Sequence, residues 1–345
     1  MPLFHTYTLT DDLDYASGAT VNVDLPKSGY ITQIDCLLES SITPGATVSA
    51  HEDALARLIA SARVHAAGET YFDIGDGRDW WFWTYYRHRG CIESTTLPTA
   101  GAGATVCRTL FEIHLGFEPQ RTPNAYLTAD GRLMRTFLGG PFDTTVAIPA
   151  IRLSNPKLEV KWGTAASLGT GFTVGTTTMT LTIHEIVLEG DEKESRIWPG
   201  GLLVPRVEST NEPLSSGHTN KSLRHDVPTQ LVLYQTLAYA LDGSDLRSDT
   251  IVSEFSVEFP PQRQTPLDLD WYEAKSENRK RTETPADKSG LYFLEWPLIS
   301  GNELGIDLMK KRPSDVQIGV SNTATASGTM RFMHVGYLPE RRTAV

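Results

Sequence analysis

Apolar and polar residues alternate along most of the chain, in runs of five to ten residues that end at Gly, Pro, Asn or Asp. A period of two is typical of β-strands with one buried face. In residues 105–117, for example, Phe111 and Ile113 share one face, while Glu112 and His114 take the other. The pattern predicts strands at 21–25, 31–40, 105–117, 158–162, 178–188, 230–241, 251–259, 267–272, 291–296, 316–320 and 329–338.

Helical periodicity is scarce. It is clearest at Glu52–Ala66, where Leu55 and Leu58 belong to an apolar stripe and Asp53 is a candidate N-cap. The second part of this segment, from Ala60, could equally be a strand. We expect a shorter helix at 301–311, and long loops rich in Gly, Ser and Thr at 98–105 and 163–178.

The strand pattern occurs in two successive halves. Residues 189–201 are highly charged, lack periodicity and end in Pro-Gly-Gly, which is typical of a connection between domains. Each half closes with a similar strand, starting at Thr178-Met179 and Thr329-Met330. The sequence therefore predicts an all-β chain with few short helices and two tandem jelly-roll domains, at 1–190 and 202–345, joined by a linker at 191–201.

Composition and charge narrow the possible partners. The chain has 345 residues and a formal net charge of −11, without a long run of Lys or Arg, so we expect no direct contact with nucleic acid. It shows no signal peptide and no run of 18 apolar residues, which predicts synthesis in the cytoplasm and no membrane span. Cys36, Cys91 and Cys107 fit neither a disulfide scaffold nor a CxxC motif, and we interpret them as reduced core thiols.

Motifs for catalysis are missing from the sequence. There is no nucleophile elbow, no phosphate-binding lysine loop and no dinucleotide fingerprint. His51 and Asp53 have the spacing of an iron-binding pair, with His114 or His184 as a conceivable third ligand, but a helix cap explains Asp53 better. We therefore expect no catalytic residues, no metal and no cofactor.

The stretch Trp80–Tyr86 has six aromatic residues in seven positions. As a strand or as a helix it is apolar on both sides, whereas a sugar or base platform needs one exposed face beside polar groups. A packing seam between barrels or subunits fits better, and we expect Trp81→Ala and Trp83→Ala to weaken subunit association more than folding. The candidate interface residues are Trp80, Trp81, Phe82, Trp83, Tyr85, Tyr86, Arg87 and Arg89.

Two tandem β-domains, a late loop excursion in each and an acidic chain without catalytic motifs resemble the double jelly-roll major capsid proteins of tailless icosahedral viruses, the tectivirus-like bacteriophages among them. The resemblance implies two eight-stranded jelly rolls per chain, homotrimers that form pseudo-hexagonal capsomers of the virion, and no enzyme activity. It also implies outer towers built by the excursions, and contacts with penton and minor capsid proteins and with an internal viral membrane near the chain ends. The N-terminal residues are neither basic nor amphipathic, and only Arg341 and Arg342 add terminal positive charge, which departs from that family.

Two other functions stay open at this point. A two-domain carbohydrate-binding protein or glycosidase would use Trp80–Tyr86 to line a groove. A jelly-roll metal enzyme would use His51 and Asp53.

Overall fold

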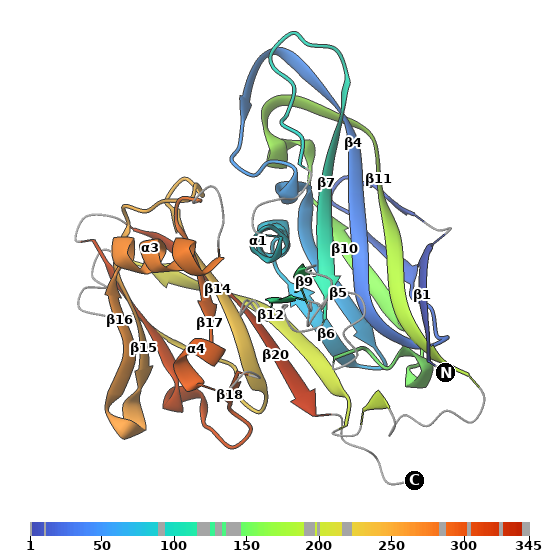
Figure 1. Cartoon of the computed structure of the whole chain (residues 1–345). Helices are drawn as coiled ribbons and strands as arrows, with labels where there is room; N and C mark the ends of the chain where they lie inside the picture. The colour runs from blue at the N-terminus through green and yellow to red at the C-terminus, as the bar shows by residue number, and fades with distance from the viewer. Residues whose placement is uncertain are drawn as a thin grey trace.

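The structure is a computed structural model that describes residues 2–9, 12–88, 94–115, 125–127, 133–135, 146–189, 197–198, 201–215, 223–282, 288–301, 305–323 and 327–339. Two β-sandwiches lie side by side, the first built by the first half of the chain and the second by the second half (Figure 1). The prediction of an all-β chain is confirmed, and helices occupy only short segments.

The first half has two sheets of four strands that face each other, with orders β1-β11-β4-β7 and β6-β5-β10-β3, and the short β2 beside β11. A small separate pair, β8 with β9, is antiparallel. The bounds are β1 (Pro2–Thr8), β2 (Leu13–Asp14), β3 (Thr20–Asp24), β4 (Tyr30–Ala50), β5 (Ile59–Ala66), β6 (Glu69–Ile74), β7 (Thr105–His114), β8 (Ala125–Leu127), β9 (Leu133–Arg135), β10 (Lys157–Trp162) and β11 (Gly169–Leu188).

The second half also has two facing sets of four strands, with orders β17-β14-β20-β12 and β13-β19-β15-β16, and the short β18 beside β14. The bounds are β12 (Leu203–Leu214), β13 (Leu223–Asp226), β14 (Val232–Asp242), β15 (Val252–Phe259), β16 (Gln264–Asp270), β17 (Leu291–Glu295), β18 (Ile306–Asp307), β19 (Gln317–Asn322) and β20 (Gly328–Pro339).

The two halves have the same topology. In each, one sheet has the order first, eighth, third and sixth strand, and the other has the order second, seventh, fourth and fifth, when the short β2, β8, β9 and β18 are left aside. This is the strand order of a jelly roll. Strands β11 and β20, in which the Thr-Met similarity lies, take the same eighth place. The sequence similarity therefore coincides with structural equivalence.

One sheet runs through both halves. Strand β12 pairs in parallel with β6, at Val207 with Phe72 and at Glu208 with Asp73. This contact joins four strands of each half, with β18, into a nine-stranded sheet. Next to it, the backbone N–H of Gly75 donates to the hydroxyl of Ser209 at 2.8 Å. The two sandwiches are thus connected by backbone hydrogen bonding as well as by side chains.

Helix α1 (Gly77–Arg87) connects β6 to β7, and α3 (Trp271–Thr282) connects β16 to β17, so these two helices occupy equivalent places in the two halves. Helix α4 (Pro297–Ser300) is a single turn. The remaining turns are the 3₁₀ segments η1 (Ala56–Leu58), η2 (Ala150–Arg152), η3 (Ala165–Leu168), η4 (Pro260–Gln262) and η5 (Pro313–Asp315). No helix within the described ranges is long and apolar enough to span a bilayer.

The helix expected at Glu52–Ala66 is wrong, and the alternative of a strand in its second part is right. Asp53 has φ 55°, a left-handed conformation that interrupts a helix, so it is not an N-cap. From Ile59 the chain forms β5, which is hydrogen-bonded on both sides by β10 and β6. Pairing with two neighbouring strands outweighs the weak helical stripe.

Three smaller predictions also need correction. The loop expected at 163–178 is mostly strand, because η3 occupies Ala165–Leu168 and β11 begins at Gly169. The helix expected at 301–311 is not formed, because Gly301 ends α4 at φ 69° and Ile306–Asp307 pair with β14. The strand expected at 267–272 ends at Asp270, and Trp271 begins α3. Trp271 is nevertheless fully buried.

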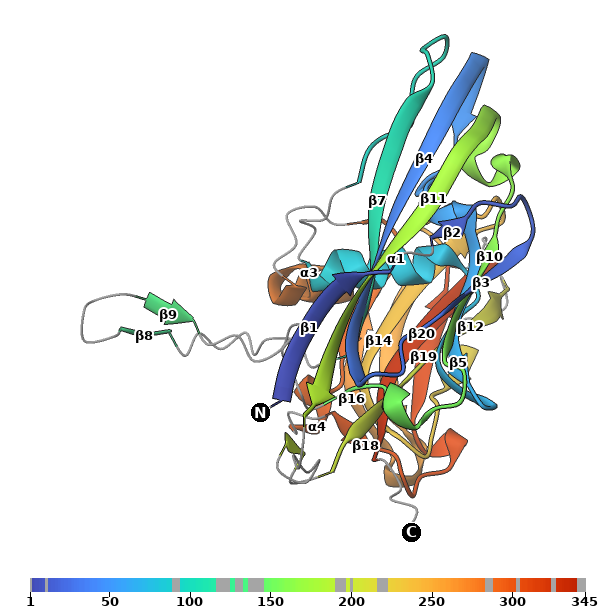
Figure 2. The same ribbon diagram turned by 90° about the vertical axis from the view of Figure 1, so that its right-hand side faces the viewer.

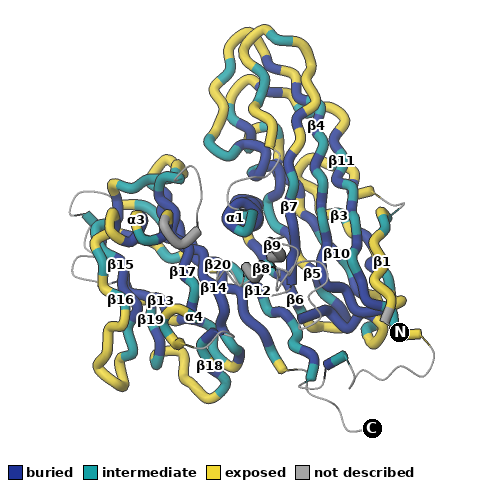
Figure 3. Tube along the Cα trace, viewed as in Figure 1, coloured by how far each residue is buried: buried dark blue, intermediate teal, exposed yellow. Residues whose placement is uncertain are grey.

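Strands β4, β7 and β11 extend beyond the first sandwich as a protrusion, visible at the top of Figures 1 and 2. At its tip Gly101 donates to the carbonyl of Gly45, which ties the 98–105 loop to β4. Most residues of the tip are exposed (Figure 3). Strand β1 begins and β20 ends at the opposite end of the molecule (Figure 1).

The apolar side chains form two main cores. The larger lies between the sheets of the first half and extends to β14, β17 and β20, and the second fills the other sandwich. A small third cluster packs Trp198 on Tyr30, with ring centroids 4.5 Å apart. The larger core crosses the boundary between the halves at α1, which is buried from Gly77 to Tyr86 and mostly dark blue in Figure 3.

Candidate functional site

Helix α1 lies at the junction between the two halves (Figure 1). Asp76 caps it, since its carboxylate accepts from the backbone N–H of Arg78 at 2.8 Å. Gly77 is required by close packing, because a Cβ there would collide with the Ala56 carbonyl and with Ile59. This capped start makes the aromatic run a helix, in which the rings surround the axis.

Some rings of α1 pack against the first half. Trp80 contacts Phe72 and Phe111, with centroids 5.3 and 5.0 Å away, and its indole N–H donates to the carbonyl of Glu112 at 2.9 Å. The indole N–H of Trp81 donates to the Thr109 hydroxyl at 3.0 Å. These contacts fix α1 on strands β6 and β7.

Other rings pack against the second half. Phe82 meets Tyr239 of β14 edge-on at 5.3 Å, and Tyr86 stacks on Phe293 of β17 at 5.4 Å with an interplanar angle of 18°. Pairs of this geometry contribute about 0.5–1.5 kcal/mol beyond the area that they bury. The helix is therefore an apolar wedge that contacts both sandwiches.

The structure places most of the predicted interface residues inside this wedge. The six aromatic side chains, from Trp80 to Tyr86, are at most 7% exposed within the single chain. Arg87 is partly exposed, and Arg89 lies outside the described residues. Trp80, Trp81, Phe82, Trp83, Tyr85 and Tyr86 therefore have their packing partners within one copy of the protein, and they form no exposed groove.

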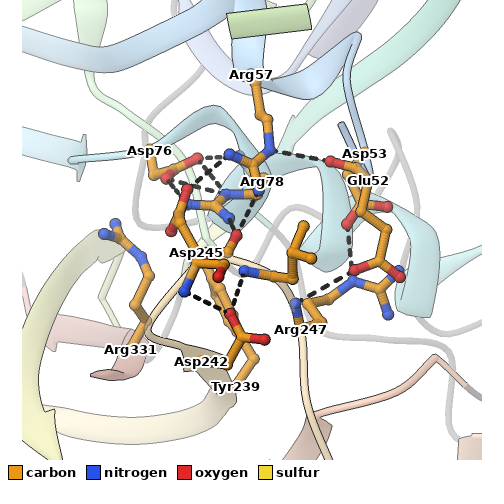
Figure 4. Close-up of polar contacts among 12 residues, drawn as sticks. Glu52, Asp53, Arg57, Asp76, Arg78, Tyr239, Asp242, Asp245, Arg247 and Arg331 are labelled. Carbon is orange, nitrogen blue, oxygen red and sulfur yellow. Dashed lines mark hydrogen bonds and ion pairs between the residues drawn. The ribbon is translucent and has the colours of Figure 1, made fainter. Parts of the chain in front are cut away.

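Ion pairs lie beside the wedge, and Figure 4 shows those of Arg57, Arg78 and Arg247. Arg331 of β20 donates to the carboxylate of Asp79 at 2.8 Å, and Tyr239 donates to the same carboxylate at 2.5 Å. Asp79 is fully buried, and the Arg331 side chain is 7% exposed. A buried pair of this kind adds little net stability, but removal of one partner leaves an uncompensated charge.

Arg247 makes a second connection. Its guanidinium binds Asp53 and Glu52, each at 2.7 Å, and lies 5.4 Å from the centroid of the Phe82 ring. The left-handed conformation of Asp53 directs its carboxylate to a residue 194 positions later in the chain. The role of Asp53 is thus to bind the second half.

Arg78 and Arg57 form the third connection. Both bind Asp245 of the second half, at 3.0 and 2.6 Å, and Arg78 also binds Asp76 at 2.7 Å. Burial opposes ionisation of Asp245, but the two guanidinium groups outweigh it and lower its pKa. Burial raises the pKa of Tyr239 well above its ordinary value, and Asp79 adds to this effect. Tyr239 is thus held as a neutral donor.

Sequence patterns missed most members of this set. Arg247 and Asp245 lie in a turn that reads as solvated, and their partners are far away in the sequence. Arg331 carried a usable signal, because it is a charge between the apolar Met330 and Phe332 in a predicted strand. A charge at such a position needs a buried partner.

A cavity of about 500 Å³ lies beside the wedge, lined among others by His51, Trp81, Tyr85 and Lys288. The rings of Trp81 and Tyr85 stack at 5.3 Å, and the Lys288 ammonium lies 5.2 Å from each centroid. Trp81 and Tyr85 are only 7% and 6% exposed, and the Lys288 ammonium lies over both rings. Little ring surface is thus open for a sugar to stack on.

The candidate metal ligands are not brought together as a site. Asp53 is bound to Arg247, while His114 contacts Gln33 at 2.7 Å and His184 contacts Asp35 at 3.0 Å. Among the described residues, no group of three or more His, Cys, Asp or Glu side chains is placed to hold a metal ion.

The cysteines are packing residues where the structure describes them. Cys36 and Cys107 are buried free thiols, and burial raises the pKa of both. Cys91 lies outside the described residues.

No family model matches the chain, and no curated protein matches it in sequence. Solved structures do match. The major capsid protein of Sulfolobus turreted icosahedral virus (STIV) superposes with a TM-score of 0.76 at 15% identity, over 99% of this chain and 100% of that one. The major capsid protein P2 of bacteriophage PM2 superposes with a TM-score of 0.56 at 14% identity, over 99% of this chain and 100% of that one. The Faustovirus major capsid protein superposes with a TM-score of 0.56 at 9% identity, over 99% of this chain and 91% of that one.

The matches extend over both halves of the chain and agree with the two equivalent topologies described above. At such low identity, the likeness reports architecture. The chain therefore has the double jelly-roll fold of these viral major capsid proteins, as the resemblance in its sequence predicted.

Proposed function

We propose that the chain is a major capsid protein, three copies of which form a pseudo-hexagonal capsomer of an icosahedral virus shell. The observation that carries this proposal is the superposition on the STIV major capsid protein along nearly the whole length of both chains. Two jelly rolls per chain give six per trimer, which is the basis of a pseudo-hexagonal outline. The protein acts in the virion by assembly, without a catalytic residue or a cofactor.

The shape of the molecule supports an orientation in the shell. The protrusion of β4, β7 and β11 lies at one end, and β1 begins and β20 ends at the other (Figure 1). In our proposal the protrusion is the outer tower and the chain ends face inward, toward an internal membrane where one is present. Penton and minor capsid proteins are further partners, and nucleic acid is not contacted directly, in line with the net charge of −11.

The junction has a specific role in this proposal. The jelly rolls correspond to residues 1–190 and 202–345, with 191–201 between them; β11 ends at Leu188 and β12 begins at Leu203, which supports these bounds. A capsomer with a fixed outline needs a fixed angle between its barrels. The aromatic wedge and the ion pairs of Asp79, Asp53 and Asp245 are suited to hold that angle.

The carbohydrate-binding alternative has less support. It requires the aromatic run to line a groove, but those rings pack within the chain. A glycan array on the purified protein tests it directly, and specific binding without self-assembly would favour it.

The decisive experiment is the mass of the purified protein by light scattering on a size-exclusion column, followed by negative-stain imaging. We expect a species of three times 38.1 kDa with a hexagonal outline. A dilution series separates a weak trimer from a monomer. A chain that stays monomeric at the highest soluble concentration, and forms no larger assemblies, contradicts the proposal.

A further inference from the structure

Two histidines meet in the core of the second half, one from each sheet. The Nε2 atoms of His225 on β13 and His334 on β20 are 2.8 Å apart. The residues are 4% and 1% exposed. Their rings are parallel within 4°, and Phe332 stacks on His225 at 4.1 Å. The two imidazoles therefore share a hydrogen bond that water does not reach.

The contact continues in both directions as a row of hydrogen bonds. Nδ1 of His225 lies 3.1 Å from the carboxylate of Glu212 on β12. Nδ1 of His334 lies 2.9 Å from the hydroxyl of Thr236 on β14, which also accepts from the indole N–H of Trp296 at 2.9 Å. The row thus runs from Glu212 through His225, His334 and Thr236 to Trp296.

The chemistry of the two ends fixes the protons between them. An ionised carboxylate only accepts, and an indole N–H only donates. His225 therefore carries its proton on Nδ1 and leaves Nε2 bare, so His334 must carry its proton on Nε2. Nδ1 of His334 then accepts from the Thr236 hydroxyl. With both rings neutral, each hydrogen bond in the row has one donor and one acceptor.

Added protons change the row in two steps. The first can bind Nε2 of His225 only if His334 moves its proton from Nε2 to Nδ1 and the Thr236 hydroxyl turns away. The imidazolium of His225 then lies beside Glu212. A second proton on Nε2 of His334 would place two N–H groups against each other across 2.8 Å, and this requires the rings to separate.

We propose that Glu212, His225, His334 and Thr236 form a pH-sensitive clasp between the two sheets of the second half, closed while the imidazoles are neutral and opened by their protonation. The clasp depends on this half of the chain alone and does not rest on the proposed capsid function. Its opening frees β13, the strand that carries His225, from the facing sheet.

Burial acts on the pKa of both rings in the same direction, and the neighbouring carboxylates oppose it at His225. Glu208 of β12 is paired with His334 in the strand register, and burial raises the pKa of its carboxyl. Burial lowers the pKa of His225, although Glu212 and Asp226 favour its charged form. Burial and the neighbouring His225 lower the pKa of His334 well below its ordinary value of 6.5. Strand β19 contributes the apolar Ile318 opposite His225, and β14 and the residue before α4 contribute Thr236 and Trp296.

The sign of the pH effect follows from these directions. Because both folded pKa values lie below the unfolded ones, the unfolded state binds more protons as the pH falls below 6.5. The clasp is fully stabilising above that pH and loses its effect below it. Each extra proton bound by the open state changes the opening equilibrium roughly tenfold per pH unit.

Long-range ¹H–¹⁵N spectra of histidine-labelled protein test the closed row at neutral pH. We expect the Nδ1–H tautomer for His225 and the Nε2–H tautomer for His334. Identical tautomers for the two rings, or titration of both near the ordinary histidine pKa, would overturn the proposal.

Hydrogen exchange of the wild-type protein tests opening. Between pH 7 and pH 5, after correction for intrinsic rates, the amides of β13 should lose protection at least tenfold. Strand β3 holds the equivalent place in the first half and contains no histidine, so its protection should not change. Equal behaviour of β3 and β13 would contradict the clasp.

His334→Phe removes one of the titrating rings and keeps an aromatic group beside Phe332. The loss of β13 protection per pH unit should become about tenfold smaller than in the wild type. His65→Gln, in the partly exposed part of β5, is the matched control and should leave the pH profile unchanged. An unchanged profile in both variants refutes the proposal, and if His334→Phe does not fold, the tautomers and the wild-type exchange decide.

Discussion

The carboxylate of Asp79 lies 2.8 Å from the guanidinium of Arg331, although the two residues are 252 positions apart and belong to different sandwiches. Neither side chain has substantial access to water. Asp79 comes from the first turn of α1 and Arg331 from the central strand β20, so this pair joins the aromatic wedge to the middle of the second half.

Asp79→Asn should destabilise the chain by about 3–5 kcal/mol, because it leaves the guanidinium of Arg331 buried without a counter-charge. Urea unfolding followed by tryptophan fluorescence measures the change. Asp73→Asn is the matched control, since Asp73 and Arg63 form an exposed pair at 3.2 Å. Such pairs contribute about 0–1 kcal/mol, and equal losses in the two variants would contradict the assigned role of Asp79.

Phe82→Ala should cost about 3–5 kcal/mol of folding stability, because it removes a fully buried ring that contacts Tyr239 and Arg247. The control is Tyr272→Ala on α3, whose ring is 66% exposed. Thermal unfolding at low protein concentration separates folding from association.

The same burial changes the expectation for Trp81→Ala and Trp83→Ala. Both side chains are packed within one chain, so we now expect folding to weaken before subunit association does. Light scattering on the folded fraction shows whether the variants that still fold also still associate. A variant that folds normally but no longer associates would restore a direct role in subunit contacts.

Gly77→Ala should destabilise by at least about 1–3 kcal/mol, because the new methyl group has no space between α1 and the Ala56 backbone. Gly103→Ala places the same group where nothing lies within 4 Å. The urea midpoints of the Gly77→Ala and Gly103→Ala variants, compared with each other, test whether Gly77 packs this closely on the Ala56 backbone. A neutral Gly77→Ala would mean that the junction can relax around the helix start.

Asp245 should make part of the stability sensitive to acid. Despite the opposing effect of burial, Arg78 and Arg57 lower its folded pKa below the unfolded value of 3.8. Its contribution is therefore complete above that value and is lost as the pH falls through the folded pKa. Asp245→Asn should flatten the stability profile below about pH 4, while Asp14→Asn, at an exposed position, should not.

Alternation in the sequence predicted strands such as β10 and β11, in which buried and less buried residues alternate. No strand was predicted at β1, β6, β12 or β13. The central strands β14 and β20 are buried on both faces, so burial there imposes no alternation. The sequence could not decide between strand and helix for Trp80–Tyr86, because a segment buried on all sides has no polar face to show its period. The cap at Asp76 and the adjacent Gly77 were the local signals for a helix. Both residues lie in the charged, Gly-rich stretch 73–79, and such a composition is also typical of a solvated turn.

The contacts at the junction between the two halves were even harder to predict from the sequence. Arg247 and Asp53 become neighbours only because both sandwiches are formed and placed, so no local pattern marks them as partners. The parallel pairing of β12 with β6 has the same origin, since neither strand differs in sequence from an ordinary edge strand. Long-range pairs need either the fold or a known relative.

The wedge also constrains how the chain is made. The partners of Tyr86 and Phe82 on β17 and β14 leave the ribosome about 150–200 residues later, which at 5–20 residues per second leaves the apolar side of α1 uncovered for roughly 8–40 s. During this interval the nascent first half exposes several aromatic rings to every other nascent chain. The yield of native protein should therefore depend on translation speed and on chaperones that bind aromatic segments.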